Sequence, residues 1–253
     1  MLYVRDIVVG VPILSSYGFL GWSSISLIHD TVSSEYILLD SGGFNNRLIL
    51  LKKLSDLGIE PSNISKILLT HLHFDHCMNL ELFPHAVVYI NEKELKYFLS
   101  NEYQRRNDLF IPKPYLEKII EKRKIVEISE GMEPHPDIVA IELPGHTPGS
   151  TGYLIEHTKI IFVGDAVKNL YELMHKKPTL YFGSLSQWKK SIDKVLKISK
   201  EIIPGHGSRI KVENEKIKEI IEKLEIEFEI VIKNSKRKFK LSTLGELIIK
   251  PNS

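Results

Sequence analysis

The segment THLHFDHCMN, residues 70–79, concentrates metal-binding side chains, because His71, His73, Asp75 and His76 lie within six consecutive positions. In an extended backbone, residues two apart point to the same side, so the first two imidazoles can reach one ion. Asp75 and His76 follow where the chain is expected to turn into a helix, so they can approach a neighbouring ion from another direction. Imidazole and carboxylate groups are ligands that zinc, iron and manganese accept. The segment therefore predicts two adjacent metal sites.

The alternative interpretation of this segment is a charged loop or a set of hydrogen-bonded core histidines. A lone histidine would favour that interpretation. The full pattern His-x-His-x-Asp-His, however, arises by chance in about one chain in a thousand of this composition. A metal site is the stronger hypothesis, and it requires further ligands from elsewhere in the chain.

Three further candidates share a sequence context: His146 in ELPGHTPGS, Asp165 in IIFVGDAV and His206 in EIIPGHGS. Each follows an apolar run that predicts a strand, and each is flanked by glycine or proline. Glycine beside a ligand lets the backbone approach an ion closely, and a strand end gives the ligand a rigid support. Turn formation alone would explain the glycines and prolines, but not a histidine or aspartate repeated in the same place.

The elements that must position these residues alternate along the chain. Short runs rich in Ile, Val and Leu predict strands, among them SKILLTH at 65–71, which carries His71 at its end. Apolar residues at helical spacing predict helices over 47–59, 91–101, 114–128, 186–200 and about 214–233. This alternation predicts an α/β protein whose sheets are covered by helices. We expect a single domain over residues 1–253, with a helical insertion at about 97–130 and a C-terminal helix and tail at about 214–253.

The composition limits the partners. Hydrophobic residues make up 43% of the 253 residues and the formal net charge is +2. Neither value indicates binding to nucleic acid or to a membrane. No apolar stretch is long enough to span a bilayer. The single cysteine excludes an intrachain disulfide and suits a reducing cytoplasm. We therefore expect a cytoplasmic protein with a small-molecule substrate, without a membrane or nucleic-acid partner, and with a homodimer left open.

Taken together, the motifs resemble the metallo-β-lactamase superfamily, over residues 1 to about 210, and look most like its lactonase and glyoxalase II-like branches. The resemblance implies an αββα sandwich of two mixed β-sheets with flanking helices. It also makes Asp40, in LLDSGG, an expected hydrogen-bond acceptor for a ligand histidine. Carried over residue by residue, the resemblance implies that His71, His73 and His146 bind a first metal, that Asp75, His76 and His206 bind a second, and that Asp165 bridges them.

Several positions depart from the patterns of the superfamily. Met78 and Asn79 stand where many members have two glycines, so we expect a differently shaped pocket floor. Asp165 stands where the common zinc β-lactamases have cysteine, which argues against an antibiotic-resistance enzyme. Lys168 occupies the place of a tyrosine that lactonases commonly have. Cys77 adjoins His76, but neighbours in a helix point about 100° apart, so we expect its thiol to pack inward.

The expected activity is hydrolysis with two divalent metal ions. Zinc is the expected metal, and iron and manganese are the alternatives. Two such ions can share a hydroxide, which would cleave an ester, lactone or thioester bond of a small molecule. Asp75 is expected to orient this nucleophile and to pass its proton to the leaving group. The alternatives are a mononuclear iron dioxygenase acting on sulfur compounds, a phosphodiesterase or ribonuclease, and a binding protein on an inactive scaffold.

Two aromatic-rich segments, residues 97–130 and 171–182, are candidates for a lid over the metals. The alternative is that their aromatic side chains pack against the fold or a second subunit. The side chains concerned are Tyr97, Phe98, Tyr103, Phe110 and Tyr115 in the first segment and Tyr171, Met174, Leu180, Tyr181 and Phe182 in the second.

Overall fold

Two six-stranded sheets form the centre of the computed structural model, which describes residues 1–220, 225–232, 235–242 and 247–249. The first sheet has the order β1 (Leu2–Val8), β4 (Ile25–Asp30), β5 (Glu35–Leu39), β6 (Ile64–Leu68), β7 (Val87–Asn91) and β8 (Ile125–Ile128). The second has the order β14 (Lys216–Ile220), β13 (Ile210–Glu213), β12 (Glu201–Pro204), β11 (Ile160–Gly164), β10 (Thr151–Ile155) and β9 (Ile138–Glu142). Both sheets contain parallel and antiparallel pairs, so both are mixed.

The two sheets pack face to face through one apolar layer, and helices cover their outer faces. In β10, Tyr153 and Ile155 point into the layer between the sheets while Leu154 points outward, as the two-residue period of a strand requires. The structure confirms the predicted αββα sandwich. The inner layer contains Ile28, Ile37, Leu39 and Leu68 from the first sheet and Ile138, Ala140, Phe162 and Ile203 from the second.

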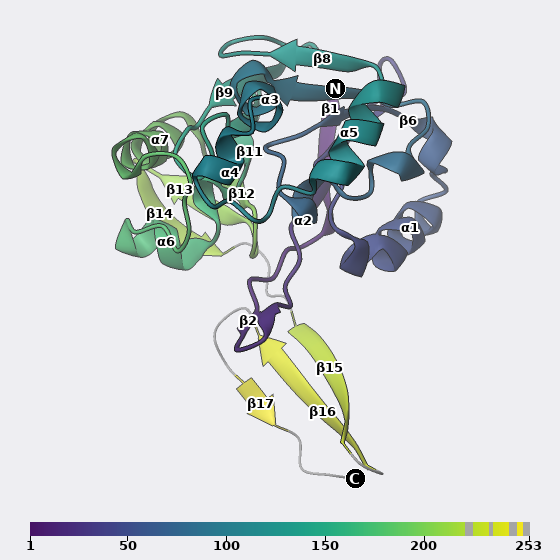
Figure 1. The fold of residues 1–253 in the computed structure, drawn as a ribbon, viewed down its shortest axis with the longest axis vertical. Helices are drawn as coiled ribbons and strands as arrows, with labels where there is room; N and C mark the ends of the chain where they lie inside the picture. Colours follow the sequence, from purple (N-terminus) through teal and green to yellow (C-terminus); the bar gives the residue numbers. More distant parts are fainter. Residues whose placement is uncertain (221–224, 233–234, 243–246, 250–253) are drawn as a thin grey trace.

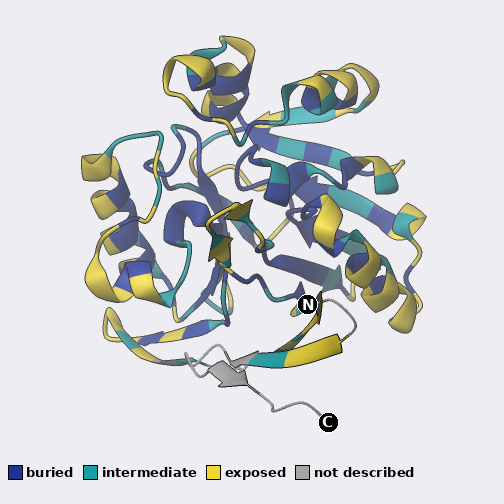
Figure 2. Cartoon of the chain, turned by 60° about the horizontal axis from the view of Figure 1, so that its bottom comes forward, coloured by how far each residue is buried: buried dark blue, intermediate teal, exposed yellow. Residues whose placement is uncertain are grey.

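Helices α1 (Arg47–Asp56), α3 (Glu92–Leu99) and α5 (Lys113–Lys122) bury residues in the cluster outside the first sheet. Helices α6 (Leu170–His175) and α7 (Leu185–Ile198) do the same outside the second sheet. Figure 1 shows α1 and α5 on one side of the molecule and α6 and α7 on the other. Figure 2 shows that exposed residues gather on these helices while the central strands are largely buried. The remaining helical segments are α2 (Phe74–Cys77), α4 (Glu102–Arg105), η1 (Phe44–Asn46), η2 (Pro61–Asn63), η3 (Leu80–Leu82) and η4 (Asp165–Val167).

The predicted helices over 91–101 and 186–200 are confirmed as α3 and α7, and each begins after a capping side chain. The Asn91 side chain accepts a hydrogen bond from the Lys93 amide at the start of α3, and the Ser184 side chain accepts one from the Gln187 amide at the start of α7. Helix α1 ends shortly before Gly58, which has a positive φ of 70°. The predicted helix over 114–128 is wrong in its second half, because Ile125–Ile128 form β8 and pair in parallel with β7.

The predicted helix over about 214–233 is also wrong. Its described residues form β14 and β15 (Glu225–Ile232). In EIEFEIVI, glutamate and apolar residues alternate at first, and a period of two places them on opposite faces of a strand. The residues predicted as a tail form β16 (Ser235–Ser242) and β17 (Leu247–Ile249), which complete a three-stranded antiparallel sheet with β15. Asn214 and Glu215 form the turn before β14, and the other residues of these predicted segments lie outside the described residues.

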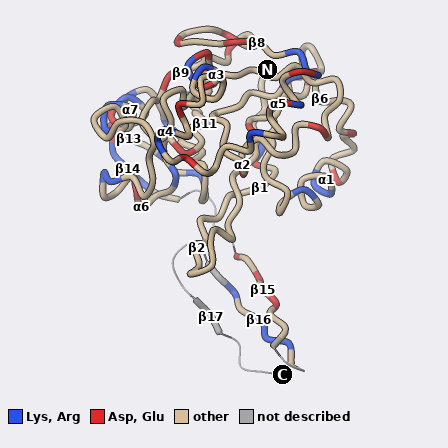
Figure 3. The backbone as a smooth tube through the Cα atoms, in the orientation of Figure 1, with Lys and Arg blue, Asp and Glu red and all other residues tan. Residues whose placement is uncertain are grey.

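This small sheet extends away from the two central sheets, toward the same end of the molecule as the hairpin of β2 (Leu14–Ser15) and β3 (Gly18–Phe19) (Figure 1). Figure 3 shows acidic residues along β15 beside basic residues along β16. Three ion pairs join the two strands: Glu229 with Lys236, Glu227 with Lys238 and Glu225 with Lys240. No helix in the described parts of the chain has both the length and the apolar character that crossing a membrane requires.

Parallel pairing brings the ends of four strands together at one edge. Strand β5 pairs in parallel with β6, and β11 pairs in parallel with β12. Because parallel neighbours end at the same edge, the residues that follow them emerge side by side. Asp40 follows β5, the segment with His71 follows β6, Asp165 follows β11 and His206 follows β12.

Candidate metal centre

All seven residues that the sequence predicts as metal ligands meet at this edge, and we call them the His/Asp cluster: His71, His73, Asp75, His76, His146, Asp165 and His206. Each has at most 5% of its surface exposed. Their potential ligand atoms form three overlapping groups, and within each group the atoms lie within 4.8 Å of one another. The groups are His71, His73 and His146; His71, His76 and Asp165; and Asp75, His76 and His206. The first and third coincide with the two ligand sets that the resemblance implied.

Four atoms of the cluster are buried and have no hydrogen-bond partner among the described residues: Nε2 of His71, His76 and His206, and Oδ1 of Asp165. The Oδ1 atom lies 3.3 Å from the nitrogen of His76 and 3.2 Å from that of His206. A buried polar atom left without a partner is costly, typically about 1–3 kcal/mol. A cation between these atoms would satisfy all of them, so the residues present fit a metal ion.

The other ring nitrogens are held by hydrogen-bond acceptors. His76 Nδ1 lies 2.7 Å from Asp40 Oδ2, His206 Nδ1 lies 2.8 Å from the Trp22 carbonyl, and His146 Nδ1 lies 3.0 Å from the Leu180 carbonyl. Carbonyl and carboxylate oxygens only accept, so each of these nitrogens carries the proton and donates it. In the neutral ring this assignment leaves the opposite nitrogen with a lone pair that faces the cluster, as metal ligation requires.

His73 and His146 also have ring nitrogens whose lone pairs face the cluster, and two of these nitrogens lie close together. His73 Nε2 lies 3.0 Å from Asp108 Oδ2, so its proton is assigned there and Nδ1 keeps the lone pair. That Nδ1 lies 3.0 Å from His146 Nε2. Burial lowers the pKa of His146 to about 3, so this ring is neutral near pH 7. With these tautomers the lone pair of His73 Nδ1 faces that of His146 Nε2, an arrangement that a cation between them would turn from repulsive to attractive.

Asp40 connects two parts of the cluster, and the expectation that it accepts a hydrogen bond from a ligand histidine is confirmed. Besides His76, it accepts hydrogen bonds from the amide and the hydroxyl of Thr70, each at 2.8 Å. The Thr70 hydroxyl also lies 3.0 Å from His71 Nδ1. Asp40 adopts a positive φ of 57°, a conformation that aspartate tolerates better than most residues.

Glycine is required where the backbone approaches Asp165. A Cβ atom on Gly205 would lie only 2.1 Å from Asp165 Oδ1. Gly164, which precedes the aspartate, has a φ of +51°, and a Cβ there would lie 2.3 Å from the Thr70 hydroxyl oxygen. Neither position can take a side chain without displacing a residue that supports the cluster.

Opposite charges shift the pKa values within the cluster. Burial alone would raise the pKa of Asp165, but Lys168, His206 and His76 hold it well below its usual range. Burial alone would lower the pKa of His76, but nearby carboxylates, with Asp75 first, raise it well above its usual value. The pKa of His206 is raised as well, because Asp165 outweighs the effect of burial. Without a metal ion, protons therefore occupy nitrogens that a cation would need.

We expect metal binding to strengthen with rising pH for this reason. A raised histidine pKa means that the apo-protein holds its protons above the ordinary value of 6.5, and metal binding must displace them. Zinc titrations between about pH 6 and pH 8 should show an affinity that rises with pH and a release of about two protons per chain. An affinity that is independent of pH over this interval would contradict the assignment of His76 and His206 as ligands.

Asp108 is a supporting residue that the sequence analysis missed. Its Oδ2 accepts a hydrogen bond from the Tyr97 hydroxyl at 3.0 Å as well as the one from His73, and its Oδ1 accepts from the Phe110 amide at 3.1 Å. The residue is 2% exposed and follows α4, within the segment predicted as an insertion. It therefore fixes the orientation and the tautomer of His73.

The Asp108→Asn variant should bind zinc about 10- to 100-fold more weakly, because His73 loses the negative charge that makes it a better ligand. Competition with a chromophoric chelator measures this change. The matched control is Asp137→Asn, since Asp137 pairs with the exposed His157 outside the cluster. Equal zinc affinity in both variants would show that Asp108 serves only the packing of its own loop.

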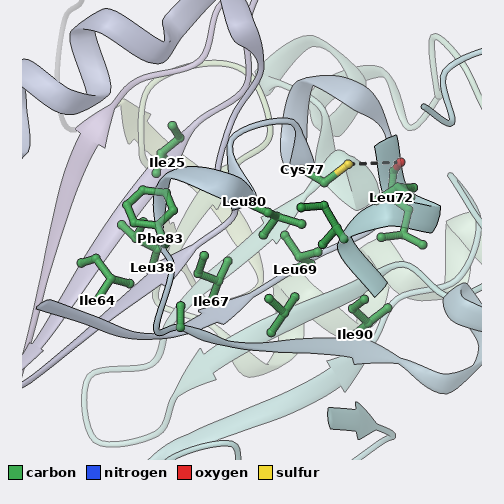
Figure 4. Packing of buried hydrophobic residues seen from close by; sticks show 14 of the residues in the cluster. Ile25, Leu38, Ile64, Ile67, Leu69, Leu72, Cys77, Leu80, Phe83 and Ile90 are labelled. Atoms are coloured by element: carbon green, nitrogen blue, oxygen red, sulfur yellow. Dashed lines mark hydrogen bonds between the residues drawn. The ribbon is translucent and has the colours of Figure 1, made fainter. Parts of the chain in front are cut away.

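Cys77 and Asn79 have structural roles. Cys77 packs inward, as predicted: its thiol is buried among apolar side chains, 3.5 Å from the Leu72 carbonyl, as Figure 4 shows. Burial raises the pKa of this thiol, so it stays protonated. The Asn79 amide donates to the carbonyls of Ser41 and Gly43. The expectation that Met78 and Asn79 shape the pocket floor is wrong, because neither residue lines the cavity beside the cluster.

A cavity of about 470 Å³ lies beside the cluster, and three segments supply its wall. Phe110 belongs to the first predicted lid segment, and Tyr171, Thr179 and Leu180 belong to the second. The hairpin β2–β3 and its flank add Pro12, Leu14 and Phe19, a contribution that the sequence analysis missed. Three of the predicted lid aromatics instead pack in the core, namely Tyr97, Phe98 and Tyr103. The remaining lining residues are His73, Phe74, Asp75, Asp165, Lys168 and Asn169.

Known proteins share this sequence pattern and this fold. The sequence profile of the metallo-beta-lactamase superfamily matches residues 23–206. The chain is 28% identical over 170 residues to a probable metallo-hydrolase of Methanocaldococcus jannaschii. The aligned segment covers 67% of this chain and 70% of the relative. The chain is also 30% identical over 204 residues to the hydroxyacylglutathione hydrolase GloC of Haemophilus influenzae. That aligned segment covers 76% of this chain and 88% of the relative. A probable metal-dependent hydrolase from Staphylococcus aureus has a similar fold, with a TM-score of 0.68 at 14% identity, covering 87% of this chain and 96% of that chain.

The profile match extends over most of the two central sheets and spans the whole His/Asp cluster, from His71 to His206. The buried imidazoles and carboxylates are able to hold metal ions, which agrees with the metal dependence of this superfamily. The chain therefore belongs to the metallo-β-lactamase superfamily and is a metal-dependent hydrolase.

Proposed function

We propose that this enzyme uses two divalent metal ions, zinc in the first place, to cleave an ester, lactone or thioester bond of a small molecule with an apolar acyl part. The observation that carries the proposal is the set of inward-facing nitrogen and oxygen atoms without partners, next to a largely apolar cavity. The similarity to GloC supports an acyl substrate, because that relative is named as a hydroxyacylglutathione hydrolase.

The residues that would bind the two ions are those whose potential ligand atoms lie within 4.8 Å of one another in the structure. His71, His73 and His146 would hold one ion, Asp75, His76 and His206 would hold the other, and Asp165 would face both. When bound, two such ions lower the pKa of a water molecule to about 7 and polarise the substrate carbonyl. The complete second set favours two ions over the single iron of a dioxygenase.

Asp75 is our candidate for proton transfer. It lines the cavity, and its Oδ2 lies 3.3 Å from His206 Nε2. Burial would raise its pKa, but His76 and His206 lower it below its ordinary value, so the carboxylate is ionised and can accept a proton from the attacking water. The same carboxylate can return that proton to the departing alkoxide or thiolate.

The acyl part of the substrate would lie against the aromatic wall. Phe74 and Phe110 stack with ring centroids 6.2 Å apart, and Phe19 meets Phe74 edge to face at 6.4 Å. Lys168 is the one cation that lines this cavity among the described residues. A cavity with so little positive charge disfavours a polyanionic nucleic acid, which supports a small-molecule substrate and argues against a ribonuclease. The single cysteine makes the cytoplasm the compartment that we propose.

Metal analysis with a substrate panel tests the proposal. Protein purified without chelator should contain about two zinc ions per chain, and dialysis against a chelator should abolish turnover until zinc is restored. The panel contains thioesters, esters and lactones with six- to ten-carbon acyl chains, together with a phosphodiester. About one iron per chain with oxygen consumption would instead identify a dioxygenase, and turnover that survives metal removal would refute the proposal.

A further inference from the structure

Lys168 lies where the His/Asp cluster meets the cavity. Its ammonium nitrogen is 3.0 Å from Asp165 Oδ2 and 5.4 Å from the centre of the Phe19 ring. The side chain is 15% exposed and lines the cavity. A lysine in a surface loop normally keeps its ammonium group in water, so this position needs an explanation.

The backbone around Lys168 is held in place from both sides. Its amide donates to the buried Glu172 carboxylate at 3.0 Å, and its carbonyl accepts from the His206 amide at 2.6 Å. Glu172 also accepts hydrogen bonds from the amide and the hydroxyl of Thr179, another lining residue. The ammonium group is therefore placed by a fixed backbone and does not sweep through solvent.

Asp165 is the one carboxylate within 4 Å of the Lys168 ammonium among the described residues. An ammonium group has three N–H donors, and the contact with Asp165 Oδ2 does not use all of them. The ordinary pKa of a lysine side chain is about 10.4, so an ammonium group is the usual form at neutral pH. A charged donor at the reacting end of an otherwise apolar cavity matches an oxygen that gains negative charge during the reaction.

We propose that Lys168 is a catalytic residue that donates a hydrogen bond to the acyl carbonyl oxygen of the substrate and stabilises it as an oxyanion. The inference rests on the proposed function. The oxygen of water bonds to the carbonyl carbon, and the π electron pair of the C=O bond moves onto the oxygen beside Lys168. When that pair re-forms the double bond, the carbon to oxygen or carbon to sulfur bond of the leaving group breaks. The proton of the water passes through Asp75 to the leaving group, and Lys168 keeps its own proton throughout.

A different role, anchoring a carboxylate at the far end of a substrate, fits the position less well. The group that Lys168 binds must lie beside Asp165, which belongs to the cluster itself. The remaining wall of the cavity is mainly apolar, with Pro12, Leu14, Phe19 and Leu180. The charge is thus at the end where the bond is broken.

The test compares Lys168→Met, which removes the charge at similar length, with Lys168→Arg, which keeps a cation. The matched control is Lys176→Met, since Lys176 is an exposed lysine of the same segment that pairs with Asp193 outside this cavity. With an acyl thioester as substrate, Lys168→Met should lower kcat about 100-fold and leave KM within about threefold. Lys168→Arg should recover part of kcat, and Lys176→Met should match the parent enzyme.

A binding measurement separates this inference from the proposed function, because it needs no turnover. Calorimetry on the zinc-loaded protein compares hexylphosphonate monomethyl ester, an anionic tetrahedral mimic, with neutral hexanol. Lys168→Met should weaken phosphonate binding about 10- to 100-fold and leave hexanol binding and zinc content unchanged. Unchanged phosphonate affinity, a rise in KM alone, or loss of zinc from this variant would each overturn the role of Lys168. Absence of turnover in the parent enzyme on every acyl substrate, with a lysine-dependent phosphonate affinity, would refute only the proposed reaction.

Discussion

The Asp165→Asn variant is expected to lose at least one of the two proposed metal ions and about 10³-fold in kcat, because a few kcal/mol of transition-state stabilisation correspond to that factor. Asp165 is the residue whose oxygens face both halves of the cluster: Oδ1 lies 3.2 Å from His206 Nε2, and Oδ2 lies 3.6 Å from His146 Nε2. Asparagine removes the negative charge and replaces one acceptor oxygen with a donor. Turned toward the histidines, this amide group cannot coordinate a cation, and turned toward Lys168 it meets another hydrogen-bond donor.

Metal content by elemental analysis and kcat on the best acyl substrate measure the effect. Asp193→Asn is the control, because Asp193 is an exposed carboxylate on α7 that pairs with a lysine in the same way. Circular dichroism of both variants checks that the fold is kept. A variant of Asp165 with two metal ions and parental kcat would show that this carboxylate does not bridge them.

The Glu94→Ala variant is expected to lose about 3–5 kcal/mol of unfolding free energy. Glu94 is fully buried, and its carboxylate accepts from the Leu72 amide at 3.1 Å, the Gly149 amide at 3.1 Å and the Thr147 hydroxyl at 2.7 Å. It thereby joins the segment with His71 and His73 to the segment with His146. Alanine would leave three buried donors without this acceptor.

Urea unfolding of the metal-free protein measures this loss without a contribution from bound ions. Glu94→Gln should lose less, because the amide oxygen still accepts from one side. The control Glu92→Gln changes an exposed glutamate in the first turn of the same helix and should stay within about 0.5 kcal/mol of the parent. If Glu94→Ala unfolds at the parental urea concentration, the two segments are held together by other contacts.

The cluster could be predicted from the sequence because each of its residues lies in a short motif with a local cause. His71 to His76 follow a buried strand at fixed spacing, and His146, Asp165 and His206 each adjoin glycine or proline. Such patterns depend on neighbours in the chain, so one sequence shows them. The sandwich followed from the same short-range signals and from the resemblance.

The supporting contacts could not be predicted, because they arise only in the folded chain. Asp108 reaches His73 across 35 positions, and Glu94 reaches Gly149 across 55. The carbonyls of Trp22 and Leu180, which orient His206 and His146, have no sequence signature at all, since every residue has a carbonyl. The predicted helix was wrong at 225–232, because the two-residue alternation of glutamate and apolar residues there indicates a strand.

The hairpin β2–β3 combines two tasks in separate parts of one loop. At its base, Val11 and Trp22 exchange backbone hydrogen bonds of 2.8 and 3.1 Å, and the carbonyl of Trp22 orients His206. At its tip, Leu14 and Phe19 contribute to the cavity wall. Substitutions at the tip can therefore change which molecules fit the cavity. The backbone contacts at the base, which orient His206, do not depend on the side chains at the tip.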